Sequence, residues 1–364
     1  MQLTPDTKLV VRLPKWLGDA VSCEPALRAL DGFYRDAGRI EHLTVAAPMR
    51  TVMLISHQFP GVQWLPTDRA PADRPAGWRG YDAALLLTNS FRSAWTVFRA
   101  RVPERIGWAR DGRGFLLTQG PSAPREKGGA ALGLGKKGGW PRHLPRGVGA
   151  GAIELVQMIG VPVRDPRPRL LPTEEGLAAA KARFERLRLA PDAPFVLANV
   201  GARPGSPKAL TPAVFAAAIA ELHRRTGLAT LLACGPGERE LLHAVQDADP
   251  GKDVYPCADP TVDLPELVAL ASRARVVLGG DTGPRHVSAA AGAPVVVVCG
   301  PTDPRHTAAG VEDQRFVRVE LDCSPCHLDA CPLTGDAHHA CMTRIPLERI
   351  VAAAEELLAL TPTA

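Results

Sequence analysis

The sequence predicts two α/β domains, each built from helices packed on a parallel β-sheet. Its 364 residues suffice for two hydrophobic cores, since one domain commonly holds about 100 to 200 residues. Short apolar runs rich in β-branched residues alternate with longer helical segments, as in chains of βα units. Residues 162–172 contain four prolines and mark the linker between a first domain, residues 1–165, and a second, residues 173–345.

The first domain opens as doubly wound α/β domains do, with a strand, a loop and a helix. The strand is expected at residues 8–13, the loop at 14–19 and the helix at about 20–34; further strands are expected at 42–47 and 82–87, a helical stretch at 49–57 and a closing helix at 153–159. Ligands of such domains bind beyond the carboxyl ends of the strands. The loops after residues 13 and 87 are therefore candidate sites.

The loop after the first strand offers Gly18 and Asp19. Gly18 frees the backbone, and Asp19 falls at the start of the following helix. Asp19 can be a helix cap that contributes about 1 kcal/mol, or a general base that stays ionised at neutral pH beside the positive helix end. After residue 87, the polar stretch at 88–93 (TNSFRS) likewise leads into a helix, where it can line a cleft or simply cap that helix.

Residues 124–147 form a glycine- and proline-rich segment that holds six lysines and arginines against one glutamate. This excess equals the formal net charge of the whole chain, +5. Such a segment suits a multiply anionic partner, such as phosphate groups, a lipid head group or nucleic acid, or it is a solvated insertion. Trp140 is its only aromatic residue, so stacking on single-stranded nucleic acid is not expected.

The second domain is a run of βα units, which predicts a parallel sheet. It begins with a charged helix at 174–188; strands are expected at 195–200, 228–234, 254–257, 275–278 and 295–299, and helices at 264–271, 283–291 and 345–360. Thr211 followed by Pro212 also marks a helix start, as a cap with proline in the first turn.

Residues 279–286, with the sequence GGDTGPRH, join a strand to a short helix. Thr282 can cap that helix, and Gly283 lets another molecule approach the backbone closely. A helix start with free N–H groups behind a glycine turn is an anion site, and phosphate is the usual anion. Ordinary βα turns also carry glycines, so this stretch alone leaves both interpretations open.

Two other strand ends of the second domain carry charged candidates. Lys208 follows the strand at 195–200 and precedes the next helix, so it can reach a phosphate or be a solvated surface lysine. Glu238 lies beyond the strand at 228–234, where a carboxylate often holds ribose hydroxyls. Glu238 can equally be a first-turn residue favoured by the helix dipole.

The cellular setting follows from the apolar runs and the cysteines. No apolar run approaches the length needed to cross a bilayer and the first residues show no signal-peptide pattern, so we expect a cytoplasmic protein with mostly reduced thiols. Cys323, Cys326, Cys331 and Cys341 lie close in sequence, which raises zinc binding. Only the first pair has knuckle spacing, so structural thiols or a redox-dependent disulfide are favoured over zinc.

Several motifs, taken together, resemble the ADP-heptose lipopolysaccharide heptosyltransferases. They are the loop at 16–19 (WLGD), residues 280–286 (GDTGPRH), residues 300–304 (GPTDP) and the cysteine tail that ends at 341–342 (CM). Within that family, residues 88–94 (TNSFRSA) and 105–108 (RIGW) are most similar to heptosyltransferase II. The resemblance spans residues 8 to about 360, and the order and spacing of the motifs make it specific.

The resemblance implies the GT-B fold, in which two Rossmann-like domains face a central cleft with the acceptor on the first and the nucleotide sugar on the second. It implies that the terminal helix, residues 346–361, packs back on the first domain. It also implies an inverting displacement without a metal or cofactor. Asp19 would take the proton of the acceptor hydroxyl, and Lys208 with the helix start at Thr282 and Gly283 would meet the charge of the departing ADP.

The resemblance implies the other site residues and the partners as well. Donor-binding residues would be Gly18, Glu238 for the ribose, Asp281 for donor hydroxyls, Thr282, Gly283 and His286, the last either orienting the site or buried as a structural histidine. Acceptor-binding residues would be Asn89, Arg92, Arg105, Lys136, Lys137 and Arg142. The substrates would be ADP-heptose and the lipopolysaccharide inner core on lipid A, at the cytoplasmic face of the inner membrane, whose anionic surface suits the basic segment. Nucleic acid is not an expected partner.

Other classes of protein share this two-domain plan. One is a related glycosyltransferase that acts on a protein or another glycan, which a test of acceptors would separate. Another is an epimerase-type enzyme, which acts on its nucleotide sugar without an acceptor. A non-catalytic nucleotide-sugar binder would keep the phosphate site yet tolerate loss of Asp19.

Overall fold

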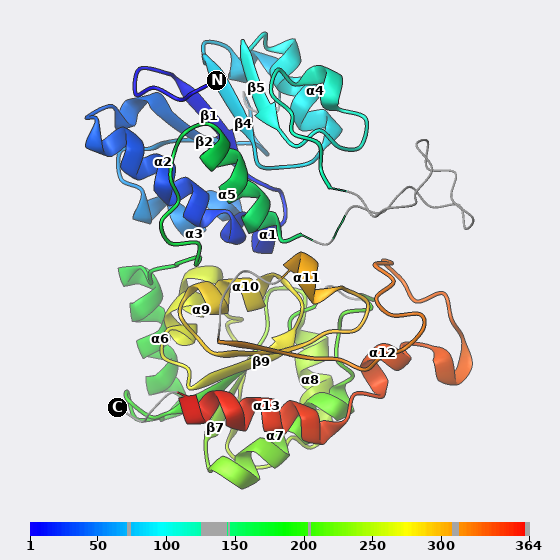
Figure 1. The fold of residues 1–364 in the computed structure, drawn as a ribbon. Helices are drawn as coiled ribbons and strands as arrows, with labels where there is room; N and C mark the ends of the chain where they lie inside the picture. The colour runs from blue at the N-terminus through cyan, green and yellow to red at the C-terminus, as the bar shows by residue number, and fades with distance from the viewer. Residues whose placement is uncertain (71–73, 125–143, 145, 203–204, 308–312, 361–364) are drawn as a thin grey trace. The chain divides into compact units, whose positions relative to one another are not determined.

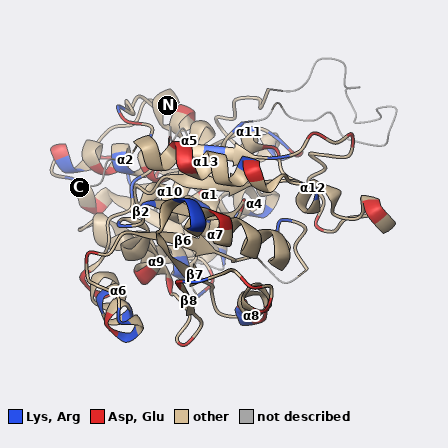
Figure 2. Ribbon diagram, turned by 90° about the horizontal axis from the view of Figure 1, so that it is seen from below, with Lys and Arg blue, Asp and Glu red and all other residues tan. Residues whose placement is uncertain are grey.

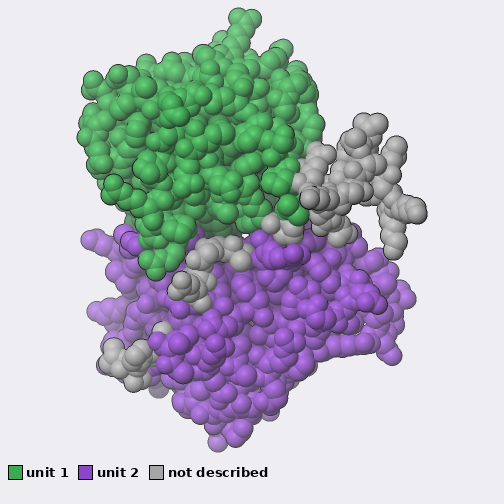
Figure 3. All heavy atoms as spheres, in the orientation of Figure 1, with its two compact units in different colours: residues 1–167 green, residues 168–364 purple. Residues whose placement is uncertain are grey.

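The computed structural model describes residues 1–70, 74–124, 144, 146–202, 205–307 and 313–360. The chain divides into two compact units, Met1–Arg167 and Pro168–Ala364, which Figure 3 shows in separate colours. This division falls inside the predicted proline-rich linker. Each unit has a parallel sheet and packed helices, as the sequence predicts (Figure 1). Of the described helices, none is both long and apolar enough to span a bilayer.

The first unit holds a five-stranded sheet in the order β3-β2-β1-β4-β5. Its strands are β1 (Leu9–Arg12), β2 (Leu43–Ala47), β3 (Gln63–Pro66), β4 (Ala83–Leu86) and β5 (Glu104–Gly107), and its α-helices are α1 (Leu17–Ser22), α2 (Glu24–Asp36), α3 (Met49–Ile55), α4 (Phe91–Arg99) and α5 (Val148–Met158). After β1 the chain proceeds to β2, whereas after β4 it proceeds to β5 on the other side. The strand order therefore reverses between β1 and β4, which is where doubly wound domains bind ligands.

Two features of the first unit differ from the prediction. The helix expected from about residue 20 is two helices, because Pro25 lacks an N–H and is tolerated only in a first turn. Consequently α1 ends at Ser22, and it begins earlier than expected, at Leu17. The edge strands β3 and β5, with sequences QWLP and ERIG, were missed because they are too short and too polar to show strand periodicity.

The second unit holds a six-stranded sheet in the order β11-β10-β9-β6-β7-β8. Its strands are β6 (Phe195–Asn199), β7 (Ala229–Ala233), β8 (Val254–Cys257), β9 (Val276–Gly280), β10 (Val295–Val298) and β11 (Gln314–Val317), and its α-helices are α6 (Glu174–Leu187), α7 (Pro212–Thr226), α8 (Arg239–Asp247), α9 (Leu264–Ala271), α10 (Gly283–Ala290), α11 (Pro304–Thr307), α12 (Ala340–Thr343) and α13 (Leu347–Leu360). Here the strand order reverses between β6 and β9. The edge strand β11 (QRFV) was also missed by the prediction.

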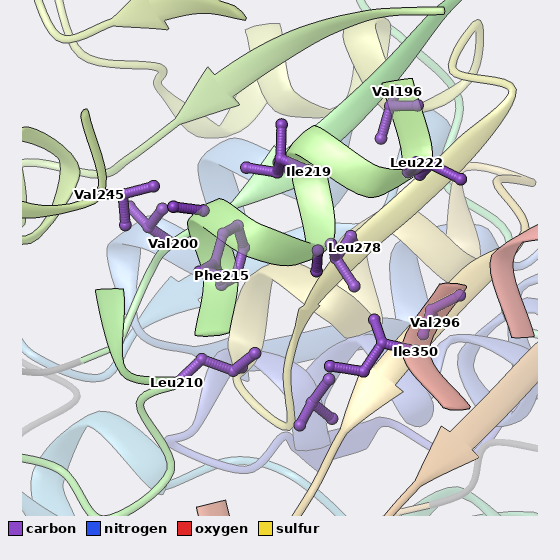
Figure 4. Close-up of a cluster of buried hydrophobic side chains, with 14 of the residues drawn as sticks. Val196, Val200, Leu210, Phe215, Ile219, Leu222, Val245, Leu278, Val296 and Ile350 are labelled. Carbon is purple, nitrogen blue, oxygen red and sulfur yellow. The ribbon is translucent and has the colours of Figure 1, made fainter. Parts of the chain in front are cut away.

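One hydrophobic core of the second unit joins the sheet to α7 and α13. Val196, Leu278 and Val296 of the sheet share this core with Ile219 of α7 and Ile350 of α13 (Figure 4). Each of these side chains is at most 1% exposed. Burial of one such side chain contributes about 1.5–3 kcal/mol to stability. The core therefore holds the ends of β6 and β9 in place beneath the loops that follow them.

The terminal helix α13 is part of this core, and its packing on the first domain stays a prediction. α13 packs on α7 and on β9, β10 and β11 (Figure 1). The residues of its apolar stripe are at most 1% exposed: Ile350, Val351, Ala354 and Leu357. Arg225 of α7 adds ion pairs to Glu348 and Glu355 of α13. The helix stays with the second unit because its apolar face is buried there.

The first helix of the second unit, α6, is held by a buried ion pair. Charges of both signs run along α6 (Figure 2), whereas its inner face carries Arg183. The Arg183 guanidinium donates two hydrogen bonds to Glu266 of α9, and both side chains are at most 5% exposed. Removing one partner of such a pair typically costs about 3–5 kcal/mol, because the other charge is left buried alone.

Candidate functional site

In the second unit, the chain leaves the neighbouring strands β6 and β9 in opposite directions along the sheet. α7 follows β6 and leads to β7, whereas α10 follows β9 and leads to β10. The two connections are joined directly, because the Thr282 hydroxyl donates a hydrogen bond of 3.0 Å to the Gly201 carbonyl. The predicted phosphate motif and the Lys208 loop therefore both start at the topological switch point, where ligands of such sheets bind.

The N-terminus of α10 has no side-chain cap. Thr282 occupies the N-cap position, as predicted, but its hydroxyl is bonded to Gly201, so the prediction that it caps the helix is wrong. Four other helices, α4, α6, α7 and α9, do have a capping side chain. Backbone N–H groups of the first turn of α10 are therefore left for an anion that approaches over Gly283.

Lys208 lies beside this helix start. A Cβ on Gly280 would come within 2.8 Å of the Lys208 carbonyl, so the absence of a side chain there lets β9 and the Lys208 loop approach each other. The side chain of Lys208 is half-buried, and its charge acts on both Asp281 and His286. The structure thus brings a cation to the predicted anion site.

Glu238 lies at the N-cap position of α8, just after β7. Its side chain does not cap that helix, because Oε2 accepts a hydrogen bond of 2.8 Å from the Gly235 N–H. A Cβ on Gly201 would come within 2.9 Å of the same oxygen. The half-buried carboxylate therefore lies between the ends of β6 and β7, next to the Thr282–Gly201 bond. Ribose binding by Glu238 stays a prediction that this position suits.

Asp281 is buried in a hydrogen-bond network, with 3% of its surface exposed. Its Oδ1 accepts a hydrogen bond of 2.7 Å from Arg285, and its Oδ2 accepts one of 2.6 Å from the Thr302 hydroxyl. Burial favours the neutral carboxyl group, but Arg285 and Thr302 outweigh burial and hold the pKa of Asp281 below its usual range. This geometry favours a positioning role for Asp281 at the start of α10 over the predicted contact with donor hydroxyls.

His286 lies in the first turn of α10 and is 8% exposed. Burial, reinforced by the charge of Arg285, lowers the pKa of His286 to about 3. The imidazole is therefore neutral at physiological pH, with one donor and one acceptor nitrogen. It can orient a ligand through hydrogen bonds but adds no charge against a phosphate.

This buried histidine predicts a loss of stability in mild acid. Below a pH of about 6.5 the unfolded chain binds a proton at this position that the folded chain rejects, so the free energy of unfolding falls by about 1.4 kcal/mol per pH unit. We expect His286→Gln to remove this contribution, which urea unfolding between about pH 6 and pH 4 would measure. The same substitution at the exposed His243 is the control. Equal pH slopes for wild type and His286→Gln would contradict the buried neutral histidine.

In the first unit, Asp19 lies in the first turn of α1, immediately beyond β1. The N-cap residue is Trp16, whose carbonyl accepts a hydrogen bond of 3.0 Å from the Ala20 N–H, so Asp19 is not the helix cap. Asp19 is half-buried, and Gly18 is buried in the same turn. Burial, with the Asp19 charge in addition, raises the pKa of the Cys23 thiol. A carboxylate in a first helical turn is favoured in its charged form, as a general base requires.

A cavity of about 590 Å³ lies beyond the carboxyl ends of the first sheet. Its lining comes from Arg12 at the end of β1 and from four connections: Leu13 and Lys15 after β1; Pro48 and Arg50 after β2; Thr67, Asp68 and Trp78 after β3; and Thr88, Ser90, Arg92, Ser93 and Thr96 after β4. Small-molecule sites commonly have volumes of about 300–1,000 Å³. We call this cavity the strand-end pocket. A smaller cavity, of about 350 Å³, lies between α2 and residues 161–165.

The strand-end pocket is strongly cationic, with Arg12, Lys15, Arg50 and Arg92 against Asp68. The carboxylate of Asp68 accepts hydrogen bonds from the Met49 N–H at the start of α3. The Arg12 guanidinium lies 5.5 Å from the ring centroid of Trp78 and has no hydrogen-bond partner among the described residues. Burial, together with the Arg92 charge, lowers the pKa of Arg12 to about 10, so it stays charged at neutral pH. The pocket therefore suits an anionic ligand.

The predicted acceptor residues are placed differently from one another. Arg92 lines the strand-end pocket. Asn89, after β4, has a buried Oδ1 without a hydrogen-bond partner among the described residues. Arg105 is not part of the lining and donates to three backbone carbonyls, which indicates a structural role. Lys136, Lys137 and Arg142 lie outside the described residues.

The prediction missed Arg12, Lys15 and Arg50. Arg12 was counted within the apolar strand at 8–13, although it is the last residue of β1. All three lie at or beyond the carboxyl end of β1 or β2, and the same rule had selected Asp19. Their position at the strand ends is therefore a signal that the sequence contains for all three cations.

The described residues include one group that could hold a metal ion. It consists of Asp303, His306 and His327, whose ligand atoms lie within 4.8 Å of one another. The Arg305 guanidinium donates to both carboxylate oxygens of Asp303 at 2.6–3.0 Å. A cation would therefore have to compete with Arg305, so these residues fit a metal poorly.

The eight cysteines are free thiols. Cys341 is buried, and burial raises the pKa of its thiol, with further contributions from Cys326, Cys323 and Cys331. The four cysteines of the tail therefore lie near one another. Whether they act as structural thiols or form a redox-dependent disulfide, the two states that the sequence favours over zinc, stays a prediction.

Comparison with known proteins identifies the family of this chain. The family model for glycosyltransferase family 9 (heptosyltransferase) matches residues 142–335, more than half of the chain. The chain belongs to glycosyltransferase family 9. The matched range includes Lys208, Glu238 and the start of α10. A curated relative, lipooligosaccharide heptosyltransferase 2 of Haemophilus ducreyi, is 27% identical over 221 residues, which is 59% of this chain and 58% of the relative's length.

Solved structures share the fold of this family 9 chain. The glycosyl transferase family 9 protein of Veillonella parvula has a TM-score of 0.73 at 18% identity, over 99% of both chains. The ADP-heptose lipopolysaccharide heptosyltransferase II of E. coli has a TM-score of 0.68 at 22% identity, over 97% of this chain and 98% of that one. The two parallel-sheet units thus match the GT-B type of fold that the sequence resemblance implied.

Proposed function

We propose that this family 9 protein transfers L-glycero-D-manno-heptose from ADP-heptose to a heptose of the lipopolysaccharide inner core, with inversion at the anomeric carbon. One observation carries the proposal: an uncapped helix N-terminus, a lysine and a carboxylate meet at one switch point of a family 9 chain. The similar proteins include a lipooligosaccharide heptosyltransferase 2 and an ADP-heptose heptosyltransferase II, which supports this substrate pair.

The second unit has the groups that a nucleoside diphosphate sugar requires. The diphosphate would lie over Gly283 at the start of α10, where backbone N–H groups and Lys208 oppose its charge. Glu238 would accept hydrogen bonds from the ribose. Asp281 would act through Arg285, by keeping the first turn of α10 in place. His286, neutral and buried beside the same turn, would orient the donor.

The first unit would bind the acceptor in the strand-end pocket. The family resemblance implies a phosphorylated inner core as the acceptor, and Arg12 offers such a phosphate a guanidinium without a hydrogen-bond partner among the described residues. Arg92 and Lys15 would add to this charge. Asp19 and Lys15 lie in the same connection, between β1 and α2. Lys15 is the residue of the two that lines the pocket.

The proposed reaction is a single displacement. Asp19 takes the proton from the acceptor hydroxyl while that oxygen forms a bond to the anomeric carbon of the heptose. The bond between that carbon and the diphosphate oxygen breaks, and ADP leaves with the electron pair. The N–H groups of α10 and Lys208 stabilise the negative charge that grows on the diphosphate. Because protein groups take this charge, the proposal includes no metal and no cofactor.

The decisive experiment measures ADP release from ADP-heptose, with and without a one-heptose lipopolysaccharide acceptor. We expect release that depends on the acceptor and a new heptose of inverted configuration in the product. A panel with a protein and another glycan as acceptors tests the related glycosyltransferases, and isomerisation of ADP-heptose without acceptor tests the epimerase type. If ADP-heptose does not bind, the donor assignment is wrong.

The strand-end pocket predicts a specific effect of Arg12→Gln on the acceptor. Loss of one charge-assisted hydrogen bond should raise the acceptor KM by about 10- to 100-fold and leave the affinity for ADP-heptose unchanged. Steady-state kinetics with a native acceptor and a dephosphorylated one would measure this. If Arg12 binds the phosphate, the acceptor KM of the variant should differ less from that of wild type with the dephosphorylated acceptor than with the native one. Arg39→Gln, at an exposed position of the same unit, is the control. An unchanged acceptor KM in Arg12→Gln would contradict the pocket assignment.

A further inference from the structure

Helix α4 of the first unit presents an aromatic stripe to solvent. Phe91, Trp95 and Phe98 have the spacing i, i+4 and i+7 and therefore lie on one helical face. Each is 42–46% exposed, and the neighbouring Phe115 is 72% exposed. The ring centroids of Phe91 and Phe115 lie 6.2 Å apart, and those of Trp95 and Phe98 lie 5.8 Å apart. Contiguous exposed apolar surface of this kind marks an interaction site.

Arginines accompany the aromatic stripe. The guanidinium of Arg99 lies 5.8 Å from the ring centroid of Trp95, and that of Arg105 lies 5.6 Å from the ring centroid of Phe98. Arg101, next to them, is exposed. None of these three arginines forms an ion pair with a described carboxylate. The face is therefore apolar and positively charged at once.

The carboxylates that follow in sequence do not neutralise this face. Glu104 accepts hydrogen bonds from Thr118 and Gln119, and Asp111 pairs with Arg110. Aromatic residues and arginine are also enriched in protein–protein interfaces, so binding to a protein is an outcome that the test must separate. The uncompensated charge on this face is positive, because it comes from arginines, and it is therefore complementary to an anionic surface.

The same helix also lines the strand-end pocket. Arg92, Ser93 and Thr96 contribute to the pocket lining, and Ala94 and Val97 pack in the hydrophobic core. The aromatic stripe, the pocket lining and the core contact are thus three sides of one rigid element. A ligand bound to the stripe would lie close to the mouth of the pocket.

We propose that the α4 face, defined as Phe91, Trp95, Phe98, Phe115, Arg99 and Arg101, docks on an anionic lipid bilayer. Aromatic rings are stable at the boundary between head groups and acyl chains, and arginine is attracted by the lipid phosphates. This inference rests on the proposed function in one respect, because docking of α4 would place the proposed acceptor pocket at the surface that holds a lipid-linked acceptor.

The test is binding of the full chain to phosphatidylcholine vesicles with and without phosphatidylglycerol. We expect wild type to co-sediment with the anionic vesicles and salt to weaken this binding. The double substitution Trp95→Gln and Phe98→Gln should weaken it by at least about tenfold. The double substitution Arg99→Glu and Arg101→Glu should weaken it similarly. Acyl chains brominated near the head group should quench tryptophan fluorescence in wild type, and Trp95→Phe should lose most of that quenching.

Matched controls lie on exposed positions away from α4. Met53→Gln with Leu177→Gln removes as much exposed apolar surface, and Arg186→Glu with Lys252→Glu changes the charge equally. Neither pair should alter vesicle binding. Full binding by the Trp95, Phe98 variant would assign attachment to other cations, such as those at 124–147, and overturn the proposal. So would a concentration-dependent dimer that the variant abolishes, because the face would then bind a second copy.

Vesicle binding is independent of transfer, so the two proposals can fail separately. If the chain binds vesicles through α4 but releases no ADP from ADP-heptose, the proposed reaction fails and the docking surface stands. If the Trp95, Phe98 variant keeps activity on a detergent-dispersed acceptor and loses it on vesicle-bound acceptor, both stand.

Discussion

Substitution of Asp19 by asparagine is expected to lower kcat by about 100- to 10,000-fold, the range that a general base contributes. Asparagine keeps the size of the side chain but cannot accept the acceptor proton. The loss of a charge in the first turn of α1 costs at most about 1 kcal/mol of stability. Because Trp16, not Asp19, is the N-cap residue, the helix keeps its start. Damage to the fold therefore cannot produce a kcat effect of that size.

Acceptor-dependent ADP release would measure kcat, and calorimetry would measure the affinity for ADP-heptose. We expect that affinity to be retained, since Asp19 belongs to the first unit and all the proposed donor groups except Gly18 belong to the second. Asp36→Asn, at an exposed position of α2, is the matched control and should leave kcat unchanged. A kcat within about threefold of wild type would exclude Asp19 as the base, whereas a general base predicts a loss of at least about 100-fold.

The central strands could be predicted from the sequence because burial dictates their composition. β9 and β10 are nearly continuous apolar runs, and β1 and β6 are equally apolar, as strands covered on both faces must be. Of the four edge strands, β8 could be predicted, whereas β3, β5 and β11 are short and half polar. Periodicity alone cannot distinguish such segments from loops.

The outlines of the site could be predicted for a similar reason. Asp19, Lys208 and Glu238 each follow a strand end, and in a parallel sheet all the carboxyl ends lie at one edge. Hydrogen bonds between residues that are far apart in the sequence do not produce a recognisable local sequence pattern. Thr282 is bonded to Gly201 and not to its own helix, and Asp281 is bonded to Thr302. The local rule therefore assigned a cap to Thr282 that a tertiary hydrogen bond replaced. The donor contact that the family resemblance implies for Asp281 stays a prediction.

The terminal helix shows that an apolar pattern does not identify the surface against which a helix packs. One face of α13 is apolar and buried, and Ile350 on that face is 1% exposed. The pattern does not say which surface covers that face. The surface is supplied by α7 and by β9, β10 and β11 of the second unit.

Lys208→Met is expected to lower kcat by about 100- to 1,000-fold, the cost of removing one group that stabilises developing negative charge. Methionine keeps most of the apolar stem, so the loop between β6 and α7 should retain its packing. Lys208→Arg should recover part of the rate, because it restores a cation with different geometry. Turnover with saturating ADP-heptose would measure these effects, and Lys252→Met, at an exposed position of the same unit, is the control.

A second readout separates loss of charge from loss of structure. The charge of Lys208 lowers the pKa of Asp281, together with Arg285 and Thr302 and against the effect of burial. It also lowers the pKa of His286, after burial and Arg285. Without that charge both pKa values should rise in the folded protein, and NMR titration of the His286 imidazole would detect the change. A large loss of kcat with an upward shift at His286 would place the ammonium at the start of α10, where the leaving diphosphate needs it. A loss of kcat without any shift would mean that Lys208 acts elsewhere, and the departing charge would then rest on the helix N-terminus alone.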